Sequence, residues 1–214
     1  MTAPALILAL GFFPALTLPA SAAEPSCCGP VTADGRRLLA VLDGTNVEFL
    51  WLAHEHINWE TGLPDKDADY AGPGRSTHCS AFAASVGKKL GVYMLRPPEH
   101  GQILLANAQA EWFRSPAGQK SGWRPLATAR DAQSLANRGS LVVVVYESPD
   151  PHRPGHVAIV RPAHRLQRLL EENGPEITQA GQKNYLKTST KVGFHVHPGA
   201  WPGGVAYYAH RIDW

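Results

Sequence analysis

Cys79 has the sequence surroundings of a catalytic thiol. It follows Ser76-Thr77-His78, and the apolar residues after it recur at helical spacing as far as Leu90. If Ser76 or Thr77 caps this helix, the thiol lies in its first turn, where free N–H groups and the helix dipole favour the thiolate. The same pattern also fits a small cysteine that is buried and inert in the core.

His156 could serve as the base for this thiol. It opens an apolar, β-branched segment directly after Pro154-Gly155. Imidazole can accept a thiol proton and later return a proton to a leaving group near neutral pH. In such a site, the backbone N–H groups at the start of the Cys79 helix would hold the oxyanion of the attacked carbonyl.

A histidine base also needs a polar partner that fixes its tautomer. Four different residues later in the chain could be this partner. Gln179 and Asn184 come from the next expected strand and its end, whereas Glu172 and Asn173 lie in the connection before that strand. The residue types alone leave this choice open.

The elements that would position these residues change in type along the chain. Helical spacing comes first and β-branched runs follow, which predicts an α+β domain with helices packed on an antiparallel sheet. The runs at 140–146 and 156–161 are separated by a turn and should pair as a hairpin. The other expected elements are one or two helices within 36–59 broken at Asp43-Gly44-Thr45, a long loop at 61–75, helices at 79–90, 101–114 and 131–137, a helical turn at 166–172, and strands at 175–180, 192–196 and 205–210.

The N-terminal segment has the features of a secretory leader. Residues 1–22 carry no charge and end in the small-residue pattern Ala20-x-Ala22, which signal peptidases cleave. Their apolar run is too short to span a membrane. We therefore expect a signal peptide over 1–22, a flexible lead-in over 23–35 and a single domain over 36–214. The mature protein should be periplasmic or secreted, without stable membrane insertion.

Composition narrows the class of protein further. Hydrophobic residues make up 44% of the 214 residues, which is enough for a substantial core. The formal charge of +2 is not gathered in a basic block, so nucleic-acid binding is not expected. Three cysteines do not make a disulfide scaffold. Cys27 and Cys28 are adjacent, and because a ring closed between neighbours is strained, no disulfide is expected between them.

Two segments resemble a known family. His78-Cys79-Ser80-Ala81-Phe82 is similar to the nucleophile segment Asp-Cys-Ser-Gly-Phe/Leu of NlpC-type peptidases. Gly155-His156-Val157-Ala158-Ile159-Val160 resembles the strand Gly-His-Val-Ala/Gly-Ile shared by NlpC-type and CHAP (cysteine, histidine-dependent amidohydrolase/peptidase) domains. Both groups belong to the papain-like cysteine hydrolases. The chain departs from the pattern at His78, where the family has Asp, and at Ala81, where it has Gly.

The resemblance implies a papain-like fold, in which a helix-borne cysteine packs on the antiparallel sheet that supplies the histidine. It implies that Cys79 is the nucleophile, that His156 is the base, and that Gln179 on the next strand orients the base. Members of the family mostly cut the peptide part of bacterial peptidoglycan. The expected function is therefore cofactor-free hydrolysis of an amide bond, with peptidoglycan stem peptides or another peptide as the substrate.

Four further residues are expected at the substrate-binding cleft. His78 and Ser80 flank the nucleophile, Trp59 precedes the long loop, and Asn184 follows the strand of Gln179. Two of these residues have a plainer interpretation: Trp59 could pack the end of a helix, and His78 could be a rim residue that only borders the cleft.

The histidines raise a metal hypothesis. His54 and His56 would point to different faces of a helix, whereas His195 and His197 would share one face of a strand and could bind zinc with a third ligand. No carboxylate or cysteine lies at a matching spacing, so no metal site is expected. Two alternatives to the hydrolase remain: a catalytically silent wall-binding domain on the same fold, and a zinc-dependent hydrolase that uses the histidines.

Overall fold

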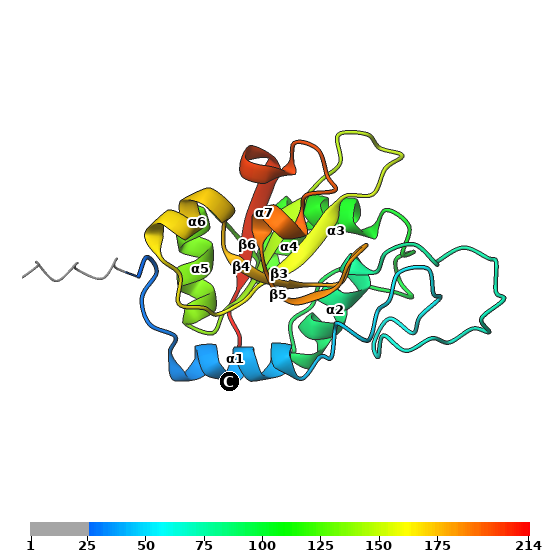
Figure 1. Ribbon diagram of the computed structural model, residues 1–214, viewed down its shortest axis with the longest axis horizontal. Coiled ribbons are helices and arrows are strands. Elements are labelled where there is room, and N and C mark those ends of the chain that lie inside the picture. Colours follow the sequence, from blue (N-terminus) through cyan, green and yellow to red (C-terminus); the bar gives the residue numbers. More distant parts are fainter. Residues whose placement is uncertain (1–25) are drawn as a thin grey trace, which may run out of the picture.

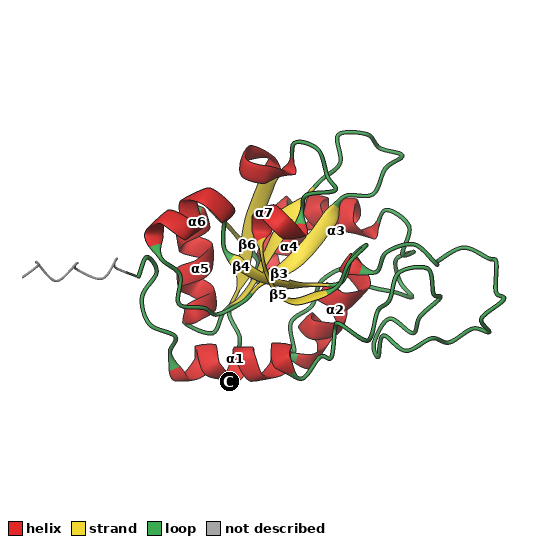
Figure 2. Ribbon diagram, viewed as in Figure 1, coloured by secondary structure: helices red, strands yellow, loops and turns green. Residues whose placement is uncertain are grey.

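A six-stranded antiparallel sheet forms the centre of the molecule (Figures 1 and 2). The computed structural model describes residues 26–214, and the expected signal peptide over 1–22 lies outside them. The strands are β1 (Arg124–Leu126), β2 (Leu141–Tyr146), β3 (His156–Val160), β4 (Glu176–Gln179), β5 (Tyr185–Ser189) and β6 (Val205–His210). They lie in the order β1-β6-β2-β3-β4-β5. The predicted α+β class is confirmed.

The helices confirm most of the helical segments expected from the sequence. They are α1 (Ala33–Asp43), α2 (Cys79–Lys89), α3 (Leu105–Arg114), α4 (Pro116–Lys120), α5 (Ala129–Asn137), α6 (Gln167–Asn173) and α7 (Thr190–Gly193), with a kinked turn at Ala200–Gly204. The short β1 and α4 were not predicted.

The hairpin of β2 and β3 is buried throughout. Every residue of both strands is buried, as expected for β-branched strands that are covered on both faces. Tyr146 pairs with His156, and Val144 pairs with Ala158. This register confirms the predicted hairpin and places His156 at the start of a central strand.

Helices cover both faces of the sheet. On one face, α1, α2 and α3 form a core with Val143 and Ile159, and Cys79 belongs to this core. On the other face, α5 and Phe194 form a core with Val144 and Ala158. Neighbouring residues of a strand point to opposite faces, so each helical layer meets alternate side chains of the same strands.

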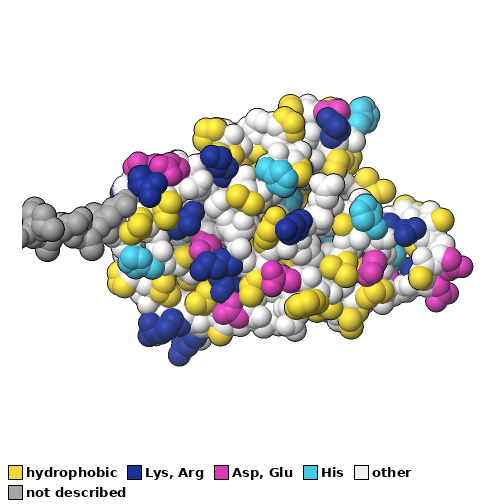
Figure 3. Space-filling view, in the orientation of Figure 1, with side chains coloured by type: hydrophobic (Ala, Val, Ile, Leu, Met, Phe, Trp, Pro, Cys, Tyr) yellow, Lys and Arg dark blue, Asp and Glu magenta, His cyan; other side chains and the backbone are white. Residues whose placement is uncertain are grey.

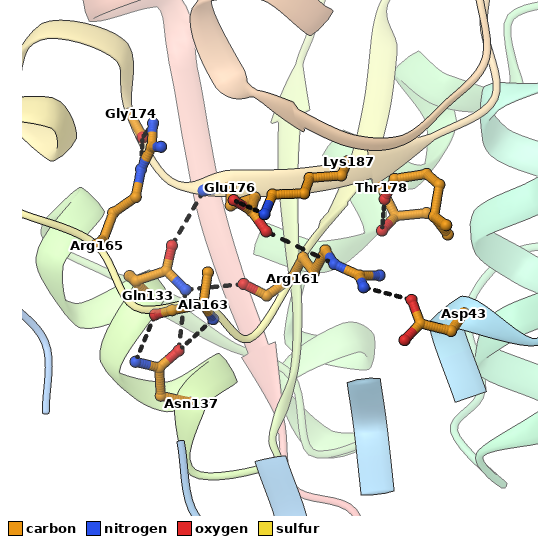
Figure 4. Close-up of polar contacts among 11 residues, drawn as sticks. Asp43, Gln133, Asn137, Arg161, Ala163, Arg165, Gly174, Glu176, Thr178 and Lys187 are labelled. Carbon is orange, nitrogen blue, oxygen red and sulfur yellow. Dashed lines mark hydrogen bonds and ion pairs between the residues drawn. The ribbon is translucent and has the colours of Figure 1, made fainter. Parts of the chain in front are cut away.

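A buried network of polar side chains joins α5 to β3 and β4 (Figure 4). The Gln133 amide donates to the Arg161 carbonyl over 2.8 Å and accepts from the Glu176 N–H over 3.0 Å. It also donates to Oδ1 of Asn137 over 3.0 Å, and this oxygen accepts from the Ala163 N–H over 2.9 Å. Buried polar groups are tolerated when their hydrogen bonds are made. Because Gln133 bonds both Arg161 and Glu176, the network holds the end of β3 against the start of β4.

Ion pairs reinforce the same end of the sheet (Figure 4). The Arg161 guanidinium bonds Asp43 at the end of α1 and lies 3.6 Å from Glu176. Lys187 of β5 lies 3.7 Å from the second oxygen of Glu176. Burial raises the pKa of Glu176, and the neighbouring cations oppose this shift. These contacts connect α1, β3, β4 and β5 at the end of β3 that lies away from His156.

Replacing Gln133 tests the buried network. In Gln133→Met, an apolar side chain of similar size would leave the Arg161 carbonyl and the Glu176 N–H without their partner. We expect the free energy of unfolding to fall by about 1–3 kcal/mol, measured by urea titration with tryptophan fluorescence. Gln119→Met on the exposed α4 is the matched control, with an expected change below about 0.5 kcal/mol. Equal effects at the two positions would contradict the role given to Gln133.

The segment between α1 and α2 differs from the prediction. Residues 44–78 contain no helix (Figure 2), so the second helix expected within 36–59 is wrong. Asn46, Trp51 and His54 have φ angles of 53°, 54° and 72°, which a right-handed helix does not accept. Trp51 is nevertheless buried in the core. The apolar spacing here therefore reflects burial of a folded loop.

Residues 185–196 also differ from the prediction. The strand in this region is β5, and the segment 192–196, which was expected to be a strand, lies in α7 and the turn after it. The Ser189 hydroxyl accepts from the Val192 N–H and thereby starts α7. Phe194 then enters the core. The apolar residues of this segment alternate as they would in a strand, but they lie in a capped helical turn and the residues that follow it.

Cys27 and Cys28 form a disulfide, which corrects the prediction that they would not. Both residues are buried against Leu170, and the Cys27 N–H donates to the Arg165 carbonyl over 2.8 Å. The prediction considered only the local ring and not this packing. Residues 26–35 thus pack against the sheet domain, and α1 begins at Ala33, within the segment 23–35 that was expected to be a flexible lead-in.

The surface carries charges of both signs. On the face shown in Figure 3, Lys and Arg side chains are interspersed with Asp and Glu. Across residues 26–214, no helix combines the length and the apolar character needed to cross a bilayer.

Candidate active site

Cys79 is the first residue of α2. This helix is buried from Cys79 to Gly87 because it runs between the sheet and the folded loop that contains Trp51. The cap residue is His78, whose side chain makes no capping bond, and not Ser76 or Thr77 as predicted. The first N–H groups of α2 therefore remain available around the thiol.

The sulfur of Cys79 accepts from the N–H of Val157 on β3, near the end at which β3 and β4 stop pairing. Ile159 and Thr178 form the last pair of these strands on this side, and beyond this pair the strands separate. Alternate N–H groups of β3 point toward β4, as the 2.7 Å bond from Arg161 to β4 shows. The Val157 N–H therefore points into the gap beyond this pair, where it donates to the Cys79 thiol and lowers the pKa of the thiol.

Burial determines the resting state of this thiol. Desolvation raises the pKa of Cys79, and the N–H groups of Val157, Ser80 and Cys79 itself lower it in part. Because desolvation is the largest of these effects, the thiol is protonated at neutral pH. The N–H groups nevertheless surround the place where negative charge would develop.

A hydrogen bond to Gln179 fixes the tautomer of His156. Nε2 of His156 lies 2.9 Å from Oε1 of Gln179, and the Gln179 amide N–H donates to the Lys183 carbonyl over 3.2 Å. This second bond orients the amide so that its oxygen faces the imidazole. Since that oxygen can only accept, Nε2 carries the proton and Nδ1 is the basic atom.

Close packing holds Gln179 in this position. Gly193 of α7 approaches it so closely that a Cβ at this position would lie 2.5 Å from Oε1 of Gln179. The backbone of Gly181 runs along the other side, where a Cβ would lie 3.3 Å from both Gln179 and His156. Glycine at these two positions lets the backbone pack directly against the pair.

Two rings enclose the imidazole of His156. Phe194 meets it edge-on with ring centroids 4.7 Å apart, and His197 stacks on it at 5.1 Å with an interplanar angle of 20°. Burial lowers the pKa of His156 to about 4, although the bond to Gln179 opposes this shift. The imidazole is therefore neutral at pH 7 and can accept a proton.

The thiol and the imidazole approach the end of β3 from opposite faces. Val157 packs in the same core as Cys79, whereas the ring of His156 contacts Phe194 and His197 on the side of α7. The alternation of side chains along a strand explains this arrangement. In the resting structure no hydrogen bond joins Cys79 to His156.

A cleft of about 520 Å³ opens over His156. His156 is 3% exposed and lines this cleft, whereas Cys79 is 4% exposed and is not part of its lining. The cleft is lined by His54, Ser76, Thr77, Pro154, Gly155, His156, Gln179, Gln182, Lys183, Tyr185, Gly193, His195, Val196 and His197.

His78 and Ser80 have other surroundings than those expected for substrate-binding residues. The His78 side chain is buried, bonds the Glu55 carbonyl over 2.9 Å, and has its pKa lowered by burial. Ser80 is also buried, and its carbonyl accepts from Gln109 over 3.2 Å. Both residues build the support around the start of α2, and neither lines the cleft.

Trp59 and Asn184 also lie outside the lining of the cleft. Trp59 packs at the edge of the core beneath the cation of Lys88. Asn184 accepts from the Gly181 N–H over 2.9 Å and donates to the Leu50 carbonyl over 2.7 Å. Asn184 thus ties the turn after Gln179 to the loop that covers α2.

Among the candidate partners of His156, Gln179 is the one that contacts it. Glu172 pairs with Arg168 on α6, and Asn173 ends that helix. The sequence reasoning missed Lys183, Phe194 and the stacking of His197. The local sequence gives little indication of these three residues, because they lie in turns whose backbone path is set by long-range packing.

The histidines that were considered as metal ligands lie in two places. Within the part of the chain that the structure describes, no three His, Cys, Asp or Glu side chains converge as a ligand set. His195 and His197 line the cleft together with His54, whereas His56 bonds Asp65.

Comparisons with known proteins add no family to this picture. No family model matches the chain, and a search of the curated proteins finds no match. The assignment of the site therefore rests on its residues and geometry.

The lowered pKa of His156 predicts sensitivity to acid. The imidazole titrates near 6.5 in the unfolded chain and near 4 in the fold, so the unfolded state binds more protons between these pH values. His156 has no effect on stability above this window. As the pH falls through it, the free energy of unfolding decreases by about 3 kcal/mol in total. Urea titrations at several pH values between 4 and 7 measure the slope.

Two histidine variants separate this effect from other acid effects. His156→Gln should reduce the pH slope, although His197, whose pKa is also lowered to about 4, keeps part of it. His152→Gln removes an exposed imidazole in the turn before β3 and should keep the full slope. An unchanged slope in His156→Gln would show that His156 is not buried as a neutral base.

Proposed function

We propose that this protein is a secreted papain-like cysteine hydrolase that cleaves an amide bond, with peptidoglycan stem peptides as its substrate. The observation that carries the proposal is the fixed tautomer of His156. The Gln179 oxygen accepts a hydrogen bond from Nε2–H of His156, which leaves Nδ1 as the base. His156 stands at the end of the strand whose next N–H, that of Val157, donates to the Cys79 thiol. The resemblance of both segments to NlpC-type and CHAP domains supports the substrate class.

In the proposed reaction, Nδ1 of His156 takes the thiol proton of Cys79 as the sulfur attacks the carbonyl carbon. The oxyanion is held by the N–H groups at the start of α2. The imidazolium then gives its proton to the leaving amine as the C–N bond breaks, which leaves a thioester on Cys79. Water attacks the thioester while His156 accepts its proton, and the acid product leaves as the thiol re-forms.

The mechanism requires a contact that the resting structure does not contain. Nδ1 of His156 must reach the sulfur through the gap between β3 and β4. Catalytic hydrogen bonds are often long or misaligned before substrate binds. Gln179 supports the step because its amide oxygen stabilises the imidazolium that forms.

Digestion of purified sacculi tests the proposed chemistry. We expect Cys79→Ala and His156→Gln to lower the rate of product release by about 10³-fold or more. Gln179→Ala should lower it by about 10-fold or more, because the imidazole loses its orientation. Chromatography and mass spectrometry of the released muropeptides measure the rates and identify the bond cut.

His152→Gln is the control for these variants and should retain the wild-type rate. Circular dichroism and urea titration establish that each variant is folded. Release of products at the wild-type rate by folded Cys79→Ala or His156→Gln would reject the mechanism.

A second function, a catalytically silent wall-binding domain, is favoured by one specific observation. Cys79 and His156 are almost wholly buried, burial raises the pKa of the thiol, and no hydrogen bond joins the two groups. These features also describe an inert core cysteine. In this alternative the cleft over His156 would hold the wall polymer without reacting with it.

Thiol labelling distinguishes the two functions. In the hydrolase, iodoacetamide should modify Cys79 of the folded protein at a measurable rate, and His156→Gln should slow this reaction because the base is lost. In the binding domain, Cys79 should react only after unfolding, and Cys79→Ala should pull down sacculi as well as the wild type does. Mass spectrometry of the labelled peptide identifies the site.

A further inference from the structure

The cleft over His156 shares lining residues with two further hollows, and the three together are called the groove. The cleft over His156 shares His54 with a hollow of about 400 Å³ that is bordered by the loop around Tyr70. It also shares His197 and Pro154 with a hollow of about 460 Å³ beside Asp150. Neighbouring hollows of this kind suit successive residues of an extended chain.

The central cleft differs from the two outer hollows in its charges. Its titratable lining residues are Lys183, Tyr185 and four histidines, and this lining contains no Asp or Glu. The outer hollows contain both signs, with Asp67 and Arg75 in one and Asp150 and Arg153 in the other. The central cleft is therefore the part of the groove that would distinguish ligands by their charge.

Lys183 supplies the permanent positive charge of the central cleft. Burial lowers the pKa of His156 and His197 to about 4, so these two rings are neutral at pH 7. The Lys183 ammonium lies 5.1 Å from the ring of Tyr185, and within residues 26–214 it forms no ion pair with a carboxylate. A lysine with this freedom can bind an incoming anion.

The backbone of Lys183 is held close to the reacting centre. Its carbonyl accepts from the amide of Gln179, the partner of His156. The turn that carries it is fixed by Asn184, which bonds both Gly181 and the loop over α2. The side chain therefore starts from a rigid position beside the base, and a group bound to it would lie near the scissile bond.

We propose that Lys183 binds a carboxylate of the substrate, which makes an acidic peptide the substrate class of this cleft. The inference rests on the proposed function for the identity of the chain in the groove, but its binding step is independent of catalysis. Lys183 is a specificity residue in this scheme and takes no part in the proton transfers of Cys79 and His156.

Binding to an inactivated protein tests the proposal. Muropeptides from purified sacculi are prepared in two forms, one with free stem-peptide carboxylates and one with these groups converted to carboxamides. Both are titrated by calorimetry into the full-length Cys79→Ala protein, which does not turn them over. We expect the carboxylate form to bind about 10- to 100-fold more tightly, as for a charge-assisted hydrogen bond.

Further substitutions in the Cys79→Ala protein locate the effect. Lys183→Gln should remove the preference for the carboxylate form, and Lys183→Arg should retain most of it. Lys191→Gln, an exposed lysine of the adjacent α7 outside the cleft, is the matched control and should keep the full preference.

Several results would overturn the proposal. They are equal binding of the two forms by the Cys79→Ala protein, binding of neither form, and a preference that survives Lys183→Gln. An equal loss of both affinities in Lys183→Gln would also reject it, because that result indicates a disturbed cleft. Failure of the hydrolase itself is read separately, from the digestion of sacculi by the wild type and Cys79→Ala.

Discussion

The pairing of β3 with β4 is the constraint on which the candidate site depends. At one end, Gln133 and the ion pairs of Arg161 hold the two strands in register. At the other end no residue pair joins the strands beyond Ile159 and Thr178, and the Val157 N–H donates to the Cys79 thiol. The same register sets His156 beside Gln179 on the neighbouring strand. A shift of β4 by one residue would turn Gln179 to the other face of the sheet, away from His156.

Burial has opposite consequences for the resting and the reacting site. It keeps the Cys79 thiol and the His156 imidazole neutral, because charge is costly away from water. The same exclusion of water strengthens the interaction of fixed N–H dipoles with any charge that does form. In the proposed hydrolase, charge separation would therefore be favoured only once an acyl group occupies the cleft. This arrangement limits oxidation and other side reactions of an idle thiol.

The local sequence predicts much of the fold and the contact between His156 and Gln179. The β-branched runs of β2 and β3 and the apolar face of α2 reflect local periodicity, and their positions were predicted correctly. The contact of Gln179 with His156 was expected from its place on the next strand. The loop around Trp51 and the turn around Phe194 were not predicted, because apolar spacing reports burial and not backbone angles. The roles of His78 and Asn184 depend on distant carbonyl groups that local patterns do not contain.

Whether the adjacent cysteines are bonded to each other depends on the redox state of the compartment in which the chain folds. Cys27 and Cys28 are bonded to each other, which leaves Cys79 as the free cysteine. Such bonds persist in oxidising compartments and are rare in the cytosol. Denatured protein exported through an oxidising compartment would thus titrate with one equivalent of a thiol reagent, whereas chains kept in a reducing cytoplasm would consume three. Preparations made by the two routes would differ at the N-terminal edge of the domain while sharing the same groove.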